Sequence, residues 1–289
     1  MYYLDGQFVA AEGAKISVLD LAILRGYAVF DYFRTYRGRP FHMEDHLQRL
    51  TYSAGQIGLP LPCPIEEIGA ITKELILRDS RKDKGIKIAL TGGVSPDQML
   101  PSAPSLIVMT LDLPSYPAKF HTEGIRVTTT SLARTFPTCK TTNYIPSVVA
   151  LQEALKQGAE DALYLNGKGE ILEATTSNFF AITKDGTLRT CISDEVLIGI
   201  TSEVLLRLAA PHFSIDLRPI SVEDEVVEAF ITASNKEIMP VAHIDGKAVG
   251  IGTRDLKTVF LQRLFKSYTS QDQWDTINIS RYTPAEKKS

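Results

Sequence analysis

The chain has 289 residues, a length that corresponds to about two domains at roughly 150 residues per domain. A chain of this size buries about three-quarters of its unfolded surface when it folds. Its residues are 44% hydrophobic and 22% charged, which excludes a largely disordered chain and a collagen-like one. The 31 basic and 34 acidic side chains give a net charge of −3 without a long basic block, so we expect no nucleic-acid partner.

The cysteines and the N-terminal residues indicate in which cellular compartment we expect the protein. Cys63, Cys139 and Cys191 are an odd number at irregular spacing, without a CxxC pair or a clustered histidine pair. This pattern indicates a reducing compartment and no metal site. No apolar run is long enough to span a bilayer, and residues 1–6 resemble neither a signal peptide nor a transit peptide. We therefore expect a cytoplasmic enzyme without a membrane partner.

Periodicity and turn residues predict a mixed α/β structure for the N-terminal part. The predicted elements are a hairpin of residues 2–4 and 7–9, a short helix after residue 20, a strand over 27–36, helices over 44–57 and 65–77, and strands over 87–91 and 105–112. Pro114 and Pro117 then interrupt the pattern. We predict a small N-terminal domain of residues 1–115 and an interdomain linker over 116–121.

Residues 122–289 are predicted to form a larger α/β domain. Its predicted elements are strands over 125–130, 161–165, 171–173, 177–182 and 229–232, and helices over 146–157, from about 201, and over 254–268. In the helix over 146–157, the spacing of Val148, Leu151 and Leu155 predicts that they face the core. The polar sequence from residue 269 is expected to be an extended or poorly ordered arm.

Lys140 is the first candidate for chemistry. It lies between a predicted strand and a predicted helix, among small neutral residues. Partial desolvation lowers the pKa of a lysine amine and makes a Schiff-base role feasible. The alternative is an ordinary lysine that faces solvent at the end of a strand.

Glu173 is the second candidate. It is followed by a run of hydroxyl side chains at 175–177 and then by a predicted buried strand. A carboxylate beside a nitrogen heterocycle favours the protonated ring, so Glu173 suits a pyridinium nitrogen. A surface turn rich in serine and threonine would give the same pattern.

The start of the predicted helix near residue 200 is the third candidate. Its backbone N–H groups, together with the Thr201 hydroxyl, form a natural seat for a phosphate. Arg49, in the predicted helix over 44–57, could supply a bidentate guanidinium to the same anion. The alternatives are an ordinary helix N-terminus and a solvated arginine on a helix face.

Taken in this order, these segments resemble the class IV (fold type IV) pyridoxal-phosphate aminotransferases. That group contains D-amino-acid and branched-chain L-amino-acid aminotransferases and aminodeoxychorismate lyase. The resemblance extends from about residue 4 to about residue 265. Its most specific parts are Lys-x-x-Asn at 140–143, Glu-x4-Asn-x-Phe at 173–180, Gly-Ile-Thr at 199–201 and Glu-Ile-Met-Pro-Val at 237–241.

The resemblance implies a fold, a cofactor and an assembly. The fold would have a small α+β domain and a larger α/β barrel-like domain, as in D-amino-acid aminotransferases, with pyridoxal 5'-phosphate (PLP) between them. The protein would exchange an amino group between an amino acid and a 2-oxo acid. It would be at least a homodimer.

The resemblance also implies roles for individual residues. Lys140 would bind the cofactor covalently and move a proton between the substrate α-carbon and the cofactor. Glu173 would contact the pyridine nitrogen, and Tyr144 the phenolic oxygen. The cofactor phosphate would be held by four further groups: Arg49, the Ile200 backbone N–H, Thr201 and Ser234.

The substrate-binding residues depart from the better-known D-amino-acid enzymes. Gly92 and Val94 stand where those enzymes hold the substrate α-carboxylate with an arginine and a histidine, and Phe30 stands where they have a tyrosine. We hypothesise that Arg25 and Lys87 replace this clamp; the alternative is that both are surface charges. Two more residues complete the set of candidate substrate contacts, Phe30 and Arg34.

The substrate class therefore stays open between several hypotheses. The short spacing from Lys140 to Asn143 and the loop over 91–96 favour D-amino acids such as D-alanine or D-glutamate. A branched-chain L-amino-acid aminotransferase is the second hypothesis, for which Tyr32, Phe33 and Tyr36 could line an apolar pocket. An aminodeoxychorismate lyase is the third hypothesis, and a non-catalytic PLP-binding relic is the fourth.

Overall fold

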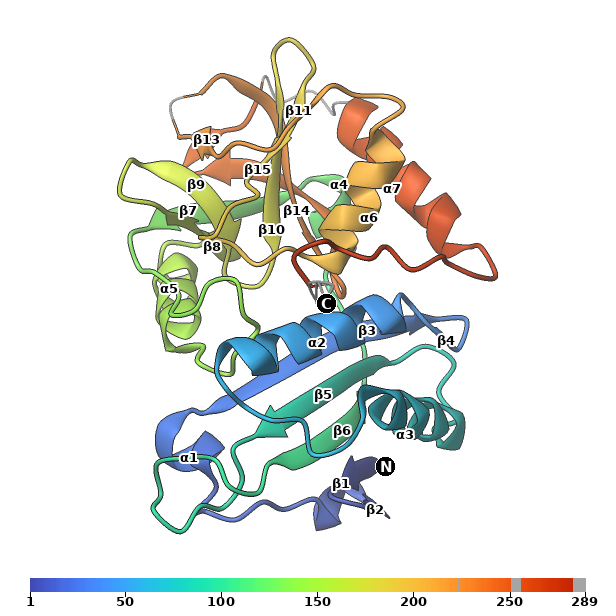
Figure 1. Cartoon of the computed structure of the whole chain (residues 1–289). Coiled ribbons are helices and arrows are strands. Elements are labelled where there is room, and N and C mark those ends of the chain that lie inside the picture. Colours follow the sequence, from blue (N-terminus) through green and yellow to red (C-terminus); the bar gives the residue numbers. More distant parts are fainter. Residues whose placement is uncertain (223, 251–255, 283–289) are drawn as a thin grey trace, which may run out of the picture. The chain divides into compact units, whose positions relative to one another are not determined.

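A computed structural model describes residues 1–222, 224–250 and 256–282 (Figure 1). Contacts group the chain into two compact units: unit 1 holds residues 1–114, 139–143 and the segment from Asp272, and unit 2 holds 115–138 and 144–271. The predicted division instead assigned residues 139–143 and the C-terminal segment to the larger domain. The difference has a physical cause. Residues 139–143 run beside a strand of unit 1, with hydrogen bonds from Phe30 N–H to the Lys140 carbonyl and from Thr142 N–H to the Ala28 carbonyl.

Unit 1 is built on a six-stranded antiparallel sheet with the order β2-β1-β6-β5-β3-β4. The strands are β1 (Tyr2–Leu4), β2 (Gln7–Val9), β3 (Ala28–Tyr36), β4 (Arg39–Pro40), β5 (Gly85–Thr91) and β6 (Ser105–Leu111). Burial alternates along most of β3, as expected for a strand with one face on the core. The other face carries the half-buried side chains of Phe30, Tyr32 and Arg34.

Two long helices of unit 1 pack on this sheet, α2 (Met43–Gln56) against β3 and α3 (Ile65–Arg78) against β6 (Figure 1). The shorter helices are η1 (Ala11–Gly13) and α1 (Leu21–Arg25). The Asp20 side chain accepts a hydrogen bond from Ala22 N–H and so caps the start of α1. Gly26 ends that helix with a φ of 65°, a left-handed conformation that favours glycine.

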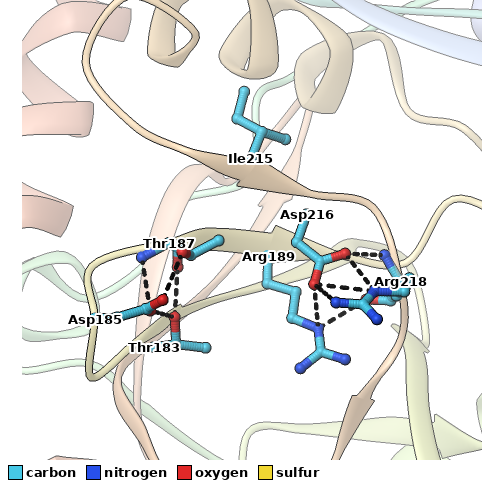
Figure 2. A pocket seen from close by; sticks show the side chains of 7 residues that line it. All are labelled: Thr183, Asp185, Thr187, Arg189, Ile215, Asp216 and Arg218. Atoms are coloured by element: carbon cyan, nitrogen blue, oxygen red, sulfur yellow. Dashed lines mark hydrogen bonds and ion pairs between the residues drawn. The ribbon is translucent and has the colours of Figure 1, made fainter.

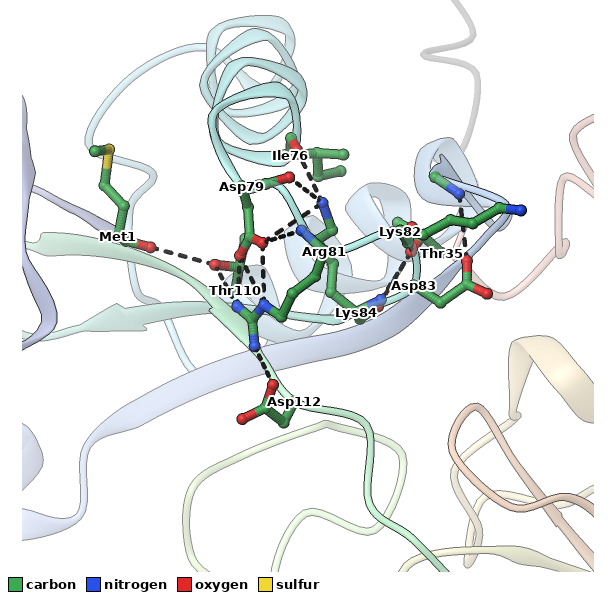
Figure 3. Close-up of polar contacts among 11 residues, drawn as sticks. Met1, Thr35, Ile76, Asp79, Arg81, Lys82, Asp83, Lys84, Thr110 and Asp112 are labelled. Carbon is green, nitrogen blue, oxygen red and sulfur yellow. Dashed lines mark hydrogen bonds and ion pairs between the residues drawn. The ribbon is translucent and has the colours of Figure 1, made fainter.

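A buried lysine closes the C-terminal end of α3 (Figure 3). The Lys84 Nζ donates hydrogen bonds to the carbonyls of Ile76 (3.1 Å) and Asp79 (2.7 Å). The last carbonyls of a helix lack intrahelical partners, and Lys84 satisfies two at this end. Arg81 binds both Asp79 and Asp112, and its hydrogen bond to Asp79 holds the pKa of that carboxyl well below its usual range. The cluster fixes the end of α3 to β5 and β6.

Unit 2 contains a closed barrel of six strands. The barrel path is β10-β14-β15-β7-β8-β9, and β9 returns to β10 through the pairing of Glu173 with Asn178. Its strands are β7 (Ile125–Thr130), β8 (Asp161–Leu165), β9 (Glu170–Ala174), β10 (Asn178–Thr183), β14 (Val226–Ala233) and β15 (Glu237–Ile244). The short strands β11 (Leu188–Thr190), β12 (Ile215–Asp216), β13 (Ile220–Ser221) and β16 (Lys247–Ala248) extend this sheet. The predicted barrel-like larger domain is confirmed.

Helices surround the barrel. The helices α6 (Ile200–Ala209) and α7 (Leu256–Thr269) contact one another and β14, while α5 (Ile145–Lys156) packs on β7 and β8 (Figure 1). A short helix, α4 (Ala118–Thr122), occupies most of the predicted linker. The linker prediction missed it because the two prolines were interpreted as breaks, whereas Pro117 is the N-cap residue of α4. In the described part of the chain, every helix is too short or too polar to cross a bilayer.

The buried face of α5 differs from the predicted one. Val148 is 51% exposed and Leu155 59% exposed, whereas Ser147, Ala150 and Ala154 are buried. Small side chains allow the helix to approach β8 closely. In addition, the Ser147 hydroxyl accepts a hydrogen bond from the Tyr164 hydroxyl (2.8 Å). Close approach therefore overrides the apolar spacing that the sequence displays.

The C-terminal segment of unit 1, described from Asp272 to residue 282, is an extended chain rather than a poorly ordered arm, and residues 283–289 of the predicted arm lie outside the described residues. After α7 it follows α2 as extended chain. The backbone N–H groups of Ile277 and Asn278 both donate to the Asp45 carboxylate at 2.9 Å. The Trp274 ring packs edge-on against Phe41, with centroids 5.0 Å apart. The segment thus contacts the helix that carries Arg49.

Candidate active site

Lys140 is held from both sides within unit 1. Its backbone N–H donates to the Ser53 hydroxyl of α2 (3.1 Å), and its carbonyl accepts from Phe30 N–H of β3 (2.9 Å). The side chain is half-buried, and its Nζ lies 4.8 Å from the centroid of the Phe30 ring. Helix and strand together therefore fix the backbone of Lys140, and its side chain is only partly exposed to solvent.

Phe30 also brings Lys87 toward Lys140. The Lys87 Nζ lies 4.5 Å from the same ring centroid, on the neighbouring strand β5. Both contacts are cation–π contacts, in which an ammonium group lies near an aromatic ring. The structure therefore gathers two predicted substrate contacts, Phe30 and Lys87, around the predicted covalent lysine.

The two predicted arginine contacts lie elsewhere in unit 1. Arg34 is half-buried on the same face of β3 as Phe30, and its guanidinium carbon lies 4.4 Å from the Tyr36 ring centroid. Arg25 is exposed in the last turn of α1, where its Nη1 donates to the carbonyl of Leu24 (3.0 Å). A role for Arg25 in substrate binding stays a prediction.

Arg49 is buried, not a solvated arginine on a helix face. It is 3% exposed and binds Asp31 of β3 in a bidentate manner, with Nε–Oδ2 and Nη2–Oδ1 distances of 2.8 Å. The His46 Nδ1 lies 2.6 Å from Asp31 Oδ1. Burial raises the pKa of Asp31, but the charges of Arg49 and His46 outweigh it and hold this pKa well below its usual range. Burial lowers the pKa of His46 and outweighs the nearby Asp31, which raises it.

Glu173 is the centre of the polar cluster in unit 2. It is 5% exposed in β9, so the surface-turn alternative is wrong. Its Oε1 forms an ion pair with Arg134, and its Oε2 accepts a hydrogen bond from Leu197 N–H (3.4 Å). The Asn178 amide donates to the carbonyl of the same Leu197 (2.7 Å). These bonds connect the carboxylate to the loop that precedes α6.

Arg134 is a member of this polar cluster that the sequence did not reveal. Its side chain is 10% exposed. Burial lowers its pKa, but the charge of Glu173 and the nearby Tyr144 and Tyr164 outweigh this effect and raise the pKa above its ordinary value. Arg134 lies in a loop, six residues before Lys140. It belongs to no periodic pattern and to none of the short motifs, so neither kind of sequence pattern could indicate it.

The start of α6 has the properties of an anion site. Gly199 is its N-cap residue, and no side chain caps the helix. A Cβ at Gly199 would lie 2.2 Å from Asn178 Oδ1, so only glycine allows this close approach. Ile200 and Thr201 are buried in the first turn, with the N–H groups that a helix start offers to a phosphate.

Lys236 is a second residue that sequence reasoning missed. Its Nζ donates to Asp161 Oδ2 (2.8 Å), Ser177 Oγ (3.0 Å) and Thr176 Oγ1 (3.1 Å). These bonds join the turn after β14, which contains the half-buried Ser234, to the turn that follows Glu173. Its partners lie 59 to 75 residues away in the sequence, so local spacing could not indicate them.

A surface pocket of about 560 Å³ lies at β11 and β12 (Figure 2). Its charged lining consists of Arg189 and Arg218, which both pair with Asp216, and of Asp185. None of the predicted site residues lines it. The charges of its two arginines are compensated by Asp216 and, for Arg189, also by Asp224.

Similarity to known proteins shows the family of this chain. The family model described as "Amino-transferase class IV" matches residues 28–244. A putative branched-chain-amino-acid aminotransferase of Methanocaldococcus jannaschii is 33% identical in an alignment 275 positions long that covers 89% of this chain and 94% of that protein. The chain belongs to the class IV aminotransferase family.

Other relatives of this aminotransferase carry two different descriptions. A D-alanine aminotransferase of Staphylococcus epidermidis is 30% identical and covers 92% of this chain and 96% of its own. The Escherichia coli branched-chain amino acid aminotransferase has a TM-score of 0.87 at 26% identity, over 96% of this chain and 99% of that one. A second branched-chain amino acid aminotransferase, solved with pyridoxamine 5'-phosphate, has a TM-score of 0.86 at 26% identity, over 93% of each chain. The predicted fold type is confirmed.

Proposed function

We propose that this class IV aminotransferase uses PLP, bound covalently at Lys140, to exchange an amino group between an amino acid and a 2-oxo acid. The observation that carries the proposal is the buried, ion-paired carboxylate of Glu173, within a family of amino-transferring enzymes. An ionised carboxylate in a dry environment favours a protonated nitrogen heterocycle next to it. Lysine, carboxylate and anion-binding groups are the donor set that PLP requires.

The phosphate of the cofactor has two matching sets of donors. The first turn of α6, with the Ile200 N–H and the Thr201 hydroxyl, offers uncapped helix donors to a dianion. Arg49 offers a guanidinium whose orientation is already fixed by Asp31. Ser234 and Tyr144 complete the proposed contacts, to the phosphate and to the phenolic oxygen respectively.

When bound, PLP supplies the electron sink that stabilises negative charge at the substrate α-carbon. Lys140 would hold the cofactor covalently, and its free Nζ would move the proton between the substrate α-carbon and the cofactor. Glu173 would hold the proton at the ring nitrogen. The amino donor leaves as a 2-oxo acid, and a second 2-oxo acid leaves as an amino acid, which gives ping-pong kinetics.

For the donor we propose D-amino acids, such as D-alanine or D-glutamate. The support is the short spacing between Lys140 and Asn143 and the relatives described as D-alanine aminotransferases. Branched-chain L-amino acids are the second candidate, favoured by the M. jannaschii relative and by the half-buried aromatic residues Tyr32 and Tyr36. Phe33, the third aromatic residue predicted for an apolar pocket, instead lies in the hydrophobic core of unit 1. Lys87, beside Phe30, is our candidate for the substrate carboxylate, with Arg25 and Arg34 as further contacts.

One set of experiments tests the reaction and the donor. Borohydride reduction of the PLP-loaded enzyme followed by peptide mapping should give a pyridoxyl adduct on Lys140; without an adduct, the relic hypothesis holds. A panel of paired D- and L-amino acids, with pyruvate or 2-oxoglutarate as acceptor, then identifies the donor. A protein that carries the adduct but transfers no amino group would fit the lyase.

We also propose a homodimer in the cytoplasm. The support for the cytoplasm is the odd number and irregular spacing of the three cysteines, a pattern typical of a reducing compartment. Several large apolar side chains are exposed on the single chain, among them Val18 (76%), Ile23 (61%) and Leu100 (67%), and burial of such side chains stabilises an assembly. Light scattering on the purified enzyme gives the mass that tests the dimer.

A further inference from the structure

Arg134 interacts with two groups that the proposed function places on the cofactor ring. Its Nη1 binds Glu173 Oε1, and its charge interacts with Tyr144. The backbone N–H of Leu197 donates to the other oxygen of Glu173, Oε2. The carboxylate is therefore held at both oxygens, by one charged and one neutral donor.

This arrangement determines where a shared proton resides. A buried carboxylate without a cation takes up a proton, because burial disfavours its charged form. A protonated Glu173 would leave a facing pyridine nitrogen neutral. A guanidinium, which does not lose its own proton, keeps the carboxylate ionised and leaves the proton to the nitrogen.

We propose that Arg134 is a positioning residue that keeps the proton of the carboxylate–pyridine pair on the cofactor nitrogen by holding Glu173 ionised and oriented. The inference rests on the proposed function, since it requires PLP with its ring nitrogen at Glu173. It goes beyond that function because it assigns the control of the ring proton to a residue that the proposed function gives no contact with the cofactor.

The charged and titratable groups around Glu173 come from several segments. Arg134 and Tyr144 lie on the chain between β7 and α5, and Tyr164 lies on β8. Cys191 follows β11, where burial and the charge of Glu173 both raise the pKa of its thiol. Arg134 is the cation of this group, so its removal should change the protonation of Glu173 more than the removal of any other member.

The test uses the PLP-loaded enzyme and ¹⁵N-labelled cofactor. The ¹⁵N chemical shift of the ring nitrogen should report a protonated pyridine in the wild-type enzyme and in Arg134→Lys. In Arg134→Met it should move to the value of a neutral pyridine. The same variant should lower kcat about tenfold or more with little change in KM, since one pKa unit corresponds to a tenfold change. Arg126→Met, which removes an exposed arginine from a pair with Glu160, is the matched control and should leave both readouts unchanged.

A double variant distinguishes an effect of Arg134→Met on folding from an effect on the protonation of the ring. If Arg134→Met alone unfolds, Arg134→Met combined with Glu173→Gln removes both buried charges and should recover the melting temperature. Its ring nitrogen should be neutral. A wild-type ¹⁵N shift in Arg134→Met, or a protonated ring in the double variant, would overturn the inference. A wild-type enzyme that forms no pyridoxyl adduct on Lys140 would instead overturn the proposed function, which makes the two failures distinguishable.

Discussion

Asp31 and Arg49 form a bidentate ion pair between β3 and α2, with both side chains buried. The pair joins the strand beside Lys140 to the helix that carries the proposed phosphate contact. Removal of one partner from a buried pair leaves an uncompensated charge and costs about 3–5 kcal/mol. The pair therefore stabilises unit 1 and orients Arg49 at the same time.

We predict that Asp31→Asn lowers the free energy of unfolding by about 3–5 kcal/mol and also weakens PLP binding. The affinity falls because Arg49 loses the partner that fixes its guanidinium. Denaturant titration and equilibrium dialysis of PLP measure the two effects. Glu160→Gln, which breaks the pair of Glu160 with the exposed Arg126, should cost about 1 kcal/mol or less. Equal losses in the two variants would refute the role of burial.

The lowered pKa of Asp31 leads us to predict that its contribution to stability is lost in acid. Its pKa in the folded protein is below the ordinary value of 3.8, because Arg49 and His46 outweigh burial. A carboxyl with a lowered pKa contributes stability above its unfolded pKa, and this contribution is lost as pH falls through the folded pKa. The stability difference between the wild type and Asp31→Asn should be constant at neutral pH and shrink as pH falls below 3.8. A difference that persists unchanged in acid contradicts this account.

Lys84→Met should destabilise unit 1. The methionine keeps the apolar volume but leaves the carbonyls of Ile76 and Asp79 without the donor that now satisfies them. Each buried unsatisfied group costs about 1–3 kcal/mol. Thermal unfolding of this variant is compared with Lys82→Met, which removes an exposed lysine two residues earlier. We expect a clear loss of melting temperature in the first variant and almost none in the second.

We predict that the contact between the C-terminal segment and Asp45 of α2 stabilises the protein. Truncation after Gln271 and Asp45→Ala remove the two sides of one contact, the hydrogen bonds from Ile277 and Asn278 to Asp45. Each change should destabilise the protein, and the double change should cost less than the sum, since contacting residues are coupled. A double-mutant cycle of unfolding free energies measures the coupling. Strict additivity would show that the segment contributes nothing through Asp45.

Local patterns explain which parts of the fold the sequence could predict. The hairpin of β1 and β2 and the strands β7 and β8 follow from residues close together in the chain, and the structure has them at the predicted residues. The prediction of the buried face of α5 was wrong, because the close approach of this helix to β8 favours the small residues Ala150 and Ala154 over larger apolar residues.

In the candidate site, too, local patterns predict residues in short motifs but not contacts between residues far apart in the chain. Lys140, Glu173 and the start of α6 were found through short motifs that resemble a family. Arg134 and Lys236 were missed because their roles depend on partners 39 and 59 to 75 residues away. Likewise, the sequence could not tell a solvated Arg49 from one that is buried against Asp31.

The last prediction concerns Lys87 and the substrate carboxylate. Its amine shares the Phe30 ring with Lys140, so it lies near the group that we propose binds PLP. A hydrogen bond to a charged group contributes about 1.5–3 kcal/mol, so Lys87→Met should lower kcat/KM by about 10- to 100-fold for substrates with an α-carboxylate. Lys73→Met, which removes an exposed lysine from a surface pair with Glu44, is the control. A decarboxylated amine of the same side chain, used as donor, should be affected little by Lys87→Met. Equal losses for the amino acid and the amine would show that Lys87 supports the site rather than the carboxylate.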